Sequence, residues 1–234
     1  MRVGIMQPYL FPYIGYFQLM NAVDEFVLYD NIEYTKKGWI NRNRILVNGK
    51  DTYLSLPLKK DSDFLYVKER YLSESWLSER KKLLNRISES YKKAPYFQEA
   101  YPLIQTILMF EDFNLFNFLY HSIKLLKEYF EIHCSITISS DISVDHNLKS
   151  ENKVIAICRK RSADVYINAI GGQNLYNNKN FRQEGIDLYF IKMNPFEYKQ
   201  FNNDFIPFLS IIDVMMFNEK AVIKEFLNTG YILI

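Results

Sequence analysis

The organisation of the chain is decided by the stretch VGIMQPYLFPYIGYFQLMNAVDEFVLYD, residues 3–30. It opens with the apolar run Val3–Met6, which a Gln-Pro pair ends, as expected of a buried strand followed by a loop. Gly15–Val23 then has apolar residues at helical spacing, and Glu25–Tyr29 is a second apolar run. Strand, loop, helix and strand in this order predict the start of a parallel α/β sheet.

The middle of the chain predicts a different kind of structure. Asn48-Gly49 lies between two apolar runs and predicts a β-hairpin, because both residues of the favoured turn need positive φ. Apolar residues at three- and four-residue spacing then predict helices at Glu74–Tyr91, Tyr96–Met109 and Phe113–Phe130. Only short loops separate these three predicted helices, so we expect an all-helical insertion.

The last part of the chain returns to alternating strands and helices. We expect strands at Ser135–Ile138, Asp164–Asn168 and Asp187–Lys192. We expect helices at Glu151–Arg161, Phe205–Phe217 and Glu219–Leu227. The sequence therefore predicts an α/β fold with a Rossmann-like parallel sheet built from both ends of the chain, residues 1–72 and 132–234, and a helical insertion or subdomain at 73–131.

Composition narrows the class of protein. Hydrophobic residues make up 48% and charged residues 24% of the 234 residues, as in globular domains and unlike disordered chains. The net charge of +2 is too small to predict binding to nucleic acid or to an anionic membrane. No apolar stretch reaches the ~18 residues of a membrane span, and the N-terminal run is too short for a signal peptide. We therefore expect a cytoplasmic protein without membrane contact.

The loop after the first expected strand is a candidate ligand site. Ligands of open α/β sheets bind beyond the carboxyl ends of strands, where this loop lies. Two prolines stiffen it. The residues that offer polar tips on rigid side chains here are Gln7, Tyr9, Tyr13 and Tyr16. The alternative is a structured loop that merely packs.

A second candidate site is the basic stretch KGWINRN and the arginine that follows it. Arginine can bind a phosphate or carboxylate through two hydrogen bonds, and a tryptophan can stack on a base or a sugar. The residues with such groups are Lys37, Trp39, Asn41, Arg42, Asn43 and Arg44. The alternative is a basic loop that leads into the hairpin. The two cysteines and three histidines lack the spacing of a zinc site, so we expect no metal.

These motifs resemble a known family. MQPYLFPYIGYFQL (residues 6–19), KGWINRN (37–43), YINAIGG (166–172) and FIPFLSIID (205–213), together with Tyr176, resemble the WbqC-like family over nearly the whole chain. The resemblance implies a role in O-antigen (lipopolysaccharide) or other surface-polysaccharide synthesis. It further implies a transferase that attaches an amino acid such as glycine to a nucleotide-linked amino sugar.

That chemistry sets the roles we expect of single residues. A sugar amine must lose a proton before it attacks an acyl carbonyl, which needs a base such as Asp30, Asp213 or His146. The carbonyl oxygen needs hydrogen-bond donors, such as Asn41 or Asn168. Further candidates for substrate binding are Gly171, Gly172, Tyr176 and Ser210. A tight turn explains the glycine pair equally well, and capping or core hydrogen bonds explain Ser210 and Asp213 equally well.

A weaker resemblance bears on the cofactor. Tyr13-Ile-Gly-Tyr16 at the start of a helix is similar to the HxGH motif of nucleotidyl transferases, in which two histidines contact ATP. Tyrosine stands at both places here, and a phenol of pKa ~10 is neutral at pH 7. This resemblance implies ATP as a candidate cofactor and an adenylating amide ligase as an alternative. A non-catalytic sugar-nucleotide-binding module is a further alternative, and the acyl donor, an activated amino acid or aminoacyl-tRNA, stays open with the oligomeric state.

Overall fold

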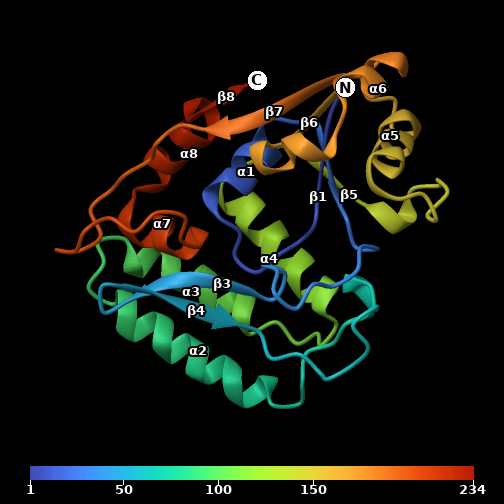
Figure 1. Ribbon diagram of the computed structural model, residues 1–234. Coiled ribbons are helices and arrows are strands. Elements are labelled where there is room, and N and C mark those ends of the chain that lie inside the picture. Colours follow the sequence, from blue (N-terminus) through green and yellow to red (C-terminus); the bar gives the residue numbers. More distant parts are fainter.

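The centre of the protein is a six-stranded sheet, seen in a computed structural model that describes residues 1–234 (Figure 1). Its strands are β1 (Arg2–Met6), β2 (Glu25–Leu28), β5 (Ser135–Ile138), β6 (Val165–Ala169), β7 (Asp187–Met193) and β8 (Tyr231–Leu233). They lie in the order β5-β2-β1-β6-β7-β8, and all neighbours are parallel except β7 and β8. This confirms the α/β, Rossmann-like sheet that the sequence predicts, with strands from both ends of the chain.

Helices cover both faces of this sheet. They are α1 (Ile14–Asn21), α2 (Trp76–Tyr91), α3 (Phe97–Leu108), α4 (Leu115–Tyr129), α5 (Ser150–Lys160), α6 (Asn178–Gln183), α7 (Ile211–Phe217) and α8 (Lys220–Thr229). Short 3₁₀ turns lie at Val67–Glu69 (η1), Ser139–Asp141 (η2) and Ile170–Leu175 (η3). Helices α5 and α6 pack on one face through a small apolar cluster, and α1, α4 and α8 lie on the other (Figure 1). None of the helices combines the length and the apolar character that crossing a bilayer requires.

The predicted hairpin is present. β3 (Arg42–Val47) pairs antiparallel with β4 (Lys50–Ser55), apart from the main sheet. Asn48 and Gly49 have φ of 50° and 74°, as the favoured two-residue turn demands. Asparagine and glycine tolerate this left-handed region better than other residues, so the turn is set locally.

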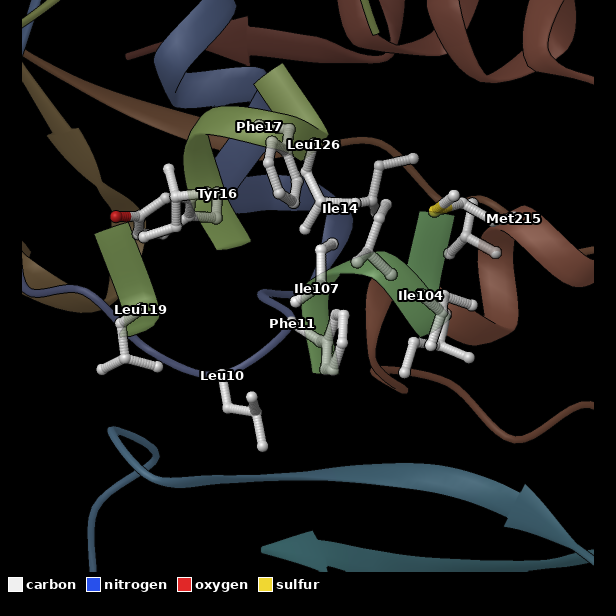
Figure 2. Close-up of a cluster of buried hydrophobic side chains, with 14 of the residues drawn as sticks. Leu10, Phe11, Ile14, Tyr16, Phe17, Ile104, Ile107, Leu119, Leu126 and Met215 are labelled. Carbon is white, nitrogen blue, oxygen red and sulfur yellow. The ribbon is translucent and has the colours of Figure 1, made fainter. Parts of the chain in front are cut away.

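The helical segment shares its core with the rest of the chain. Side chains of α2, α3 and α4 lie in one cluster of 49 buried residues together with α1, α7, α8 and the hairpin. In Figure 2, Phe11 and Ile14 from the N-terminal loop and helix lie beside Ile104 and Ile107 of α3. The apolar packing is continuous across the boundaries of residues 73–131. A separate helical subdomain there therefore stays a prediction.

One predicted helix is shorter than expected, and two elements were not expected. The helix predicted at Phe205–Phe217 begins only at Ile211, where the Ser210 side chain accepts a hydrogen bond from the Ile212 N–H as its cap. Pro207 and the positive φ of Phe208 (59°) keep the preceding residues irregular. Helix α6 and the edge strand β8 are too short for periodicity to reveal.

Candidate functional site

The strands place several polar residues at one edge of the sheet. β1, β2, β5 and β6 are parallel, so their carboxyl ends meet there, and the chain direction across the sheet reverses between β1 and β6. Ligands of such sheets bind beyond the carboxyl ends, near this reversal. Gln7 follows β1, Asp30 follows β2, Ser139 follows β5, and Asn168 lies at the end of β6. We call this region the carboxyl edge.

Asp30 is the buried carboxylate of the carboxyl edge. The residue is 1% exposed, and its Oδ1 accepts a hydrogen bond of 2.9 Å from the backbone N–H of Ser140. Its Oδ2 lies 3.7 Å from Nζ of Lys68, whose backbone N–H donates to the Asp30 carbonyl oxygen. One carboxylate oxygen is thus anchored, and the other faces a cation that is too distant for a hydrogen bond.

His146 reaches the same place from the loop between β5 and α5. Its Nδ1 lies 3.0 Å from Nδ2 of Asn31, and the Ser139 hydroxyl donates to Oδ1 of Asn31 at 3.0 Å. His146 Nε2 forms no hydrogen bond within the protein. Of the four residues predicted as catalytic, Asp30 and His146 are thus linked indirectly, because His146 contacts Asn31, the residue that follows Asp30 in the chain.

Lys153 completes this group and was not among the predicted site residues. It lies in the first turn of α5, is only 4% exposed, and its Nζ is 4.9 Å from the centre of the Tyr29 ring. The ammonium forms no hydrogen bond or ion pair in the protein. Burial lowers the pKa of Lys153, the neighbouring Lys68 lowers it further, and Asp30 opposes both. Burial also raises the pKa of Tyr29 to about 12, and the phenol of Tyr176 is among its neighbours.

At the end of β6, Asn168 and Gly172 are in close contact. Asn168 is 6% exposed, and its Oδ1 accepts from the N–H of Ala169. A Cβ on Gly172 would lie 2.6 Å from Asn168 Nδ2, whereas a Cβ on Gly171 would meet nothing within 4 Å. Burial raises the pKa of Tyr176. Only Gly172 of the pair is therefore required by its surroundings.

The tyrosines of the N-terminal motif face the apolar core instead. Tyr16 lies in the cluster of buried apolar side chains (Figure 2) and is 4% exposed. Its hydroxyl has no hydrogen-bond partner, and its ring packs against Phe26. The Tyr9 hydroxyl accepts from the N–H of Tyr13, whose own hydroxyl donates to Sδ of Met193. Internal hydrogen bonds thus engage Tyr9 and Tyr13, and Tyr16 is held by packing alone.

The polar residues beneath the hairpin hold the N-terminal loop in place. Nδ2 of Asn43 donates to the carbonyl oxygens of Leu10 at 3.0 Å and Phe11 at 2.7 Å. The hydroxyl of Ser210 donates to the same Phe11 oxygen at 3.0 Å. Asn43 is 3% exposed and Ser210 is fully buried. Both residues therefore have structural contacts that need no ligand.

Asp213 and Asn41 are likewise engaged inside the protein. Asp213 is fully buried and accepts hydrogen bonds from Tyr91, Tyr198 and Gln200, at 2.7 to 2.8 Å. Burial raises the pKa of Asp213, and these three hydrogen bonds oppose the rise. Asn41 accepts from the Tyr34 hydroxyl and donates to the carbonyl oxygen of Leu56. Neither side chain lies with Asp30 and His146 at the carboxyl edge.

The two arginines of the second motif lie on the outer face of the hairpin, together with two aromatic residues. We call these four residues the hairpin ladder: Trp39, Arg42, Arg44 and Tyr53. Trp39 and Tyr53 stack at 6.1 Å, and each carries one arginine over its ring, Arg44 and Arg42 respectively. Arg42 also donates to the carbonyl oxygens of Lys37 and Gly38, and Arg44 pairs with Asp51 at 2.7 Å.

The two motifs meet through a hydrogen bond of 3.0 Å from Leu10 N–H to the Ile40 carbonyl. The Asn43 contacts with the same loop are directed inward. The arginines point to the outer face of the hairpin. The contact between the two motifs is therefore part of the packed interior, and the hairpin ladder is a separate surface.

Six residues of the carboxyl edge were missed from the sequence: Tyr29, Asn31, Lys68, Ser139, Ser140 and Lys153. A signal existed for one of them. Lys153 lies four residues before Ile157 and beside Val154 on the buried face of α5, where a lysine is out of place. The others are ordinary loop residues whose role depends on which strands become neighbours.

Comparison with known proteins places the chain in a family. The WbqC-like protein family matches residues 7–225. A relative is uncharacterized protein Rv1507c of Mycobacterium tuberculosis (strain ATCC 25618 / H37Rv), which is 25% identical over 229 residues that cover 97% of each chain. No solved structure matches. Because the family match spans nearly the whole chain and includes both motifs, the chain belongs to the WbqC-like protein family.

Proposed function

We propose that the protein transfers an amino-acid acyl group, glycine or a similar residue, to the amine of a nucleotide-linked amino sugar in surface-polysaccharide synthesis. Membership of the WbqC-like family supports the pathway through that family's general association with O-antigen synthesis. The observation that carries the chemistry is the contact of His146 with Asn31, next to the buried Asp30, at the carboxyl edge. The proposal includes a cytoplasmic location, where nucleotide-linked sugars and aminoacyl-tRNA are present.

The reaction needs a base, and His146 is suited to that role. Heavy-atom positions do not distinguish the oxygen from the nitrogen of the Asn31 amide. With the amide turned over, its oxygen accepts from His146 Nδ1–H, and the Ser139 hydroxyl accepts from its NH₂ group. His146 Nε2 then carries a free lone pair and no protein partner. It takes the proton that the sugar ammonium loses before the amine attacks the acyl carbonyl.

The other groups of the carboxyl edge have complementary roles in this proposal. Asp30 accepts the Ser140 N–H and precedes Asn31, so it helps to position the Asn31 amide that orients His146. The amide of Asn168 and the backbone N–H groups of η3 around Gly171, where the space beside the chain is open, provide donors for the negative charge that develops on the carbonyl oxygen. Acyl transfer then forms the amide bond, and the donor leaves with its electron pair as a phosphate, a tRNA hydroxyl or a thiol.

The test is turnover by the purified full-length chain. A nucleotide-linked amino sugar is incubated with glycine and ATP, or with glycyl-tRNA, and mass spectrometry looks for a gain of one glycyl group. Dependence on ATP indicates the adenylating ligase, and dependence on tRNA indicates direct aminoacyl transfer. We expect His146→Gln and Asp30→Asn to lower kcat/KM roughly 100-fold or more. The exposed His133, changed to Gln, is the matched control.

Two outcomes would count against the proposal. Wild-type turnover in both Asp30→Asn and His146→Gln would exclude the carboxyl edge as the reaction site. Absence of product with tight binding of the sugar nucleotide would favour the alternative, a non-catalytic binding module. The exposed hairpin ladder favours that alternative, since Trp39 and Tyr53 are 41% and 49% exposed and offer stacking surfaces.

A further inference from the structure

Two lysines converge on Asp30 from distant parts of the chain. Lys68 comes from η1, with its Nζ 3.7 Å from Asp30 Oδ2, and Lys153 comes from α5 on the other side of the carboxyl edge. The Lys153 ammonium lies over the ring of Tyr29, the residue before Asp30, and Asp30 raises its pKa whereas Lys68 lowers it. Asp30 already accepts the Ser140 N–H on one of its two oxygens. Two cations therefore face one carboxylate, which leaves a local excess of positive charge.

Lys153 is the more unusual of the two. An ammonium has three N–H donors, and a buried one normally gives them to oxygen acceptors. At 4% exposure, Lys153 has only the Tyr29 ring, which attracts a cation but accepts no proper hydrogen bond. The aliphatic part of the side chain is buried, whereas Nζ keeps contact with solvent and is not one of the fully buried polar atoms. Its hydrogen-bond acceptors therefore come from solution and not from the protein.

The position of the group allows that acceptor to come from solution. The Lys68 side chain is 39% exposed, so the group is open to solvent on that side, whereas the Asp30 side chain is 2% exposed. The first turn of α5, an 11-residue helix, directs the positive end of its dipole to the same place. Buried charge, excess cation and an open side occur together at the edge of the sheet where ligands of this fold class bind.

We propose that Lys153 and Lys68, held by Asp30, form a subsite for an oxyanion of the substrate, either a phosphate or a carboxylate. Lys153 donates its free N–H groups to the oxyanion, and Lys68 closes the site from the solvent side. A bound diphosphate would place the sugar of a nucleotide-linked substrate beside His146, and a bound carboxylate would place an amino acid there. This assignment of the substrate rests on the proposed function, but the oxyanion subsite itself does not.

The first experiment measures binding by calorimetry with inorganic pyrophosphate and, separately, with glycine. The full chain is compared with Lys153→Met and with Lys160→Met, a lysine on the exposed end of the same helix. We expect at least one probe to bind the wild type, and Lys153→Met to weaken it roughly 10- to 100-fold. Lys160→Met should bind as the wild type does. A response to pyrophosphate assigns the subsite to the diphosphate, and a response to glycine assigns it to the amino acid.

A second measurement on the unmodified protein keeps the proposal testable if Lys153→Met fails to fold. NMR of the lysine Nζ groups follows the titration of Lys153 with and without the probe. A bound oxyanion favours the ammonium form, so it should raise the pKa of Lys153 from its lowered value. The proposal is overturned if neither probe binds or if Lys153→Met binds the probe as the wild type does. It is also overturned if a bound probe leaves the titration of the Lys153 resonance unchanged.

These results separate the subsite from the proposed function. Oxyanion binding through Lys153 without formation of a glycyl sugar would support the subsite and contradict the proposed acyl transfer. Formation of a glycyl sugar that is unchanged in Lys153→Met would support the acyl transfer and contradict the subsite.

Discussion

The carboxyl edge and the region beneath the hairpin use buried polar residues in opposite ways. Beneath the hairpin, Asp213 accepts three hydrogen bonds and Asn43 donates two, so both are satisfied within the chain. At the carboxyl edge, the ammonium of Lys153 and Nε2 of His146 have no hydrogen-bond partner in the protein. Buried polar atoms without a partner also occur in the apolar core, as the Tyr16 hydroxyl shows, so a missing partner alone does not indicate a ligand. The carboxyl edge differs because its unpartnered nitrogens lie together where they can reach solvent, and this makes it the better functional candidate.

The strongest test of the structural side is Asn43→Ala. The substitution removes the only side-chain donor to the Leu10 carbonyl and one of two to Phe11, and leaves a small cavity. We expect the free energy of unfolding to fall by about 3 kcal/mol in urea denaturation. Asn152→Ala on the exposed side of α5 should change it by no more than about 0.5 kcal/mol. Equal, small effects of the two would mean that the N-terminal loop is held by other contacts.

The hairpin ladder offers the next largest effect, on substrate binding. If Trp39 stacks on the base or sugar of the nucleotide, Trp39→Ala should raise KM for the nucleotide sugar about tenfold and leave kcat unchanged. Steady-state kinetics with the proposed substrate measure both. Tyr71→Ala, which removes another aromatic residue of similar exposure, is the control. An unchanged KM would indicate that the substrate binds at the carboxyl edge without contacting Trp39.

The glycine pair after β6 gives a smaller effect with an internal control. In Gly172→Ala the new Cβ would lie 2.6 Å from Asn168 Nδ2 and push that side chain from its position, at a cost of about 1 kcal/mol in stability. Gly171→Ala should stay within about 0.5 kcal/mol, because nothing lies within 4 Å of its Cβ position. Thermal unfolding of both variants checks the difference. Equal destabilisation would show that Asn168 adapts freely.

The smallest effect is a pH dependence at the carboxyl edge. Burial lowers the pKa of Lys153 in the folded protein, so the unfolded chain binds more protons between that pKa and about 10.4. Stability therefore rises with pH through this window as the buried ammonium loses its charge. Lys153→Met should lack this contribution, so its advantage over the wild type at neutral pH should shrink as the pH increases. Urea denaturation at several pH values measures that difference, and a constant difference would contradict a desolvated Lys153.

The local elements were predictable because their signals are local. The turn of the hairpin follows from Asn48-Gly49, and the strand at Ser135–Ile138 from its alternating residues. Strand β8 was missed because its three residues form a strand only by pairing with β7, as Leu233 does with Ile191. Helix α7 was predicted six residues too long because the hydrogen bond from Ile206 N–H to Gln200 belongs to the tertiary structure.

The candidate site was predictable only in part. Asp30 and His146 have side chains with acid–base chemistry, which makes them candidates in any context. The aromatic motif around Tyr16 drew attention because it is unusual, yet the structure uses it to fill the core (Figure 2). Lys153 was missed because lysines in helices are mostly solvated, although its spacing from Ile157 places it on the apolar face of α5.

By itself, the sequence determined the α/β class, the type of most elements, the hairpin turn and the family resemblance, since all of these depend on residue type and short-range spacing. The tertiary structure alone decided which polar groups are satisfied and which are left open. Asn31 and His146 lie 115 residues apart in the chain and 3.0 Å apart in space. Burial and hydrogen bonding are properties of such distant pairs, and the cost of an unpaired charge arises only after packing has excluded water from it.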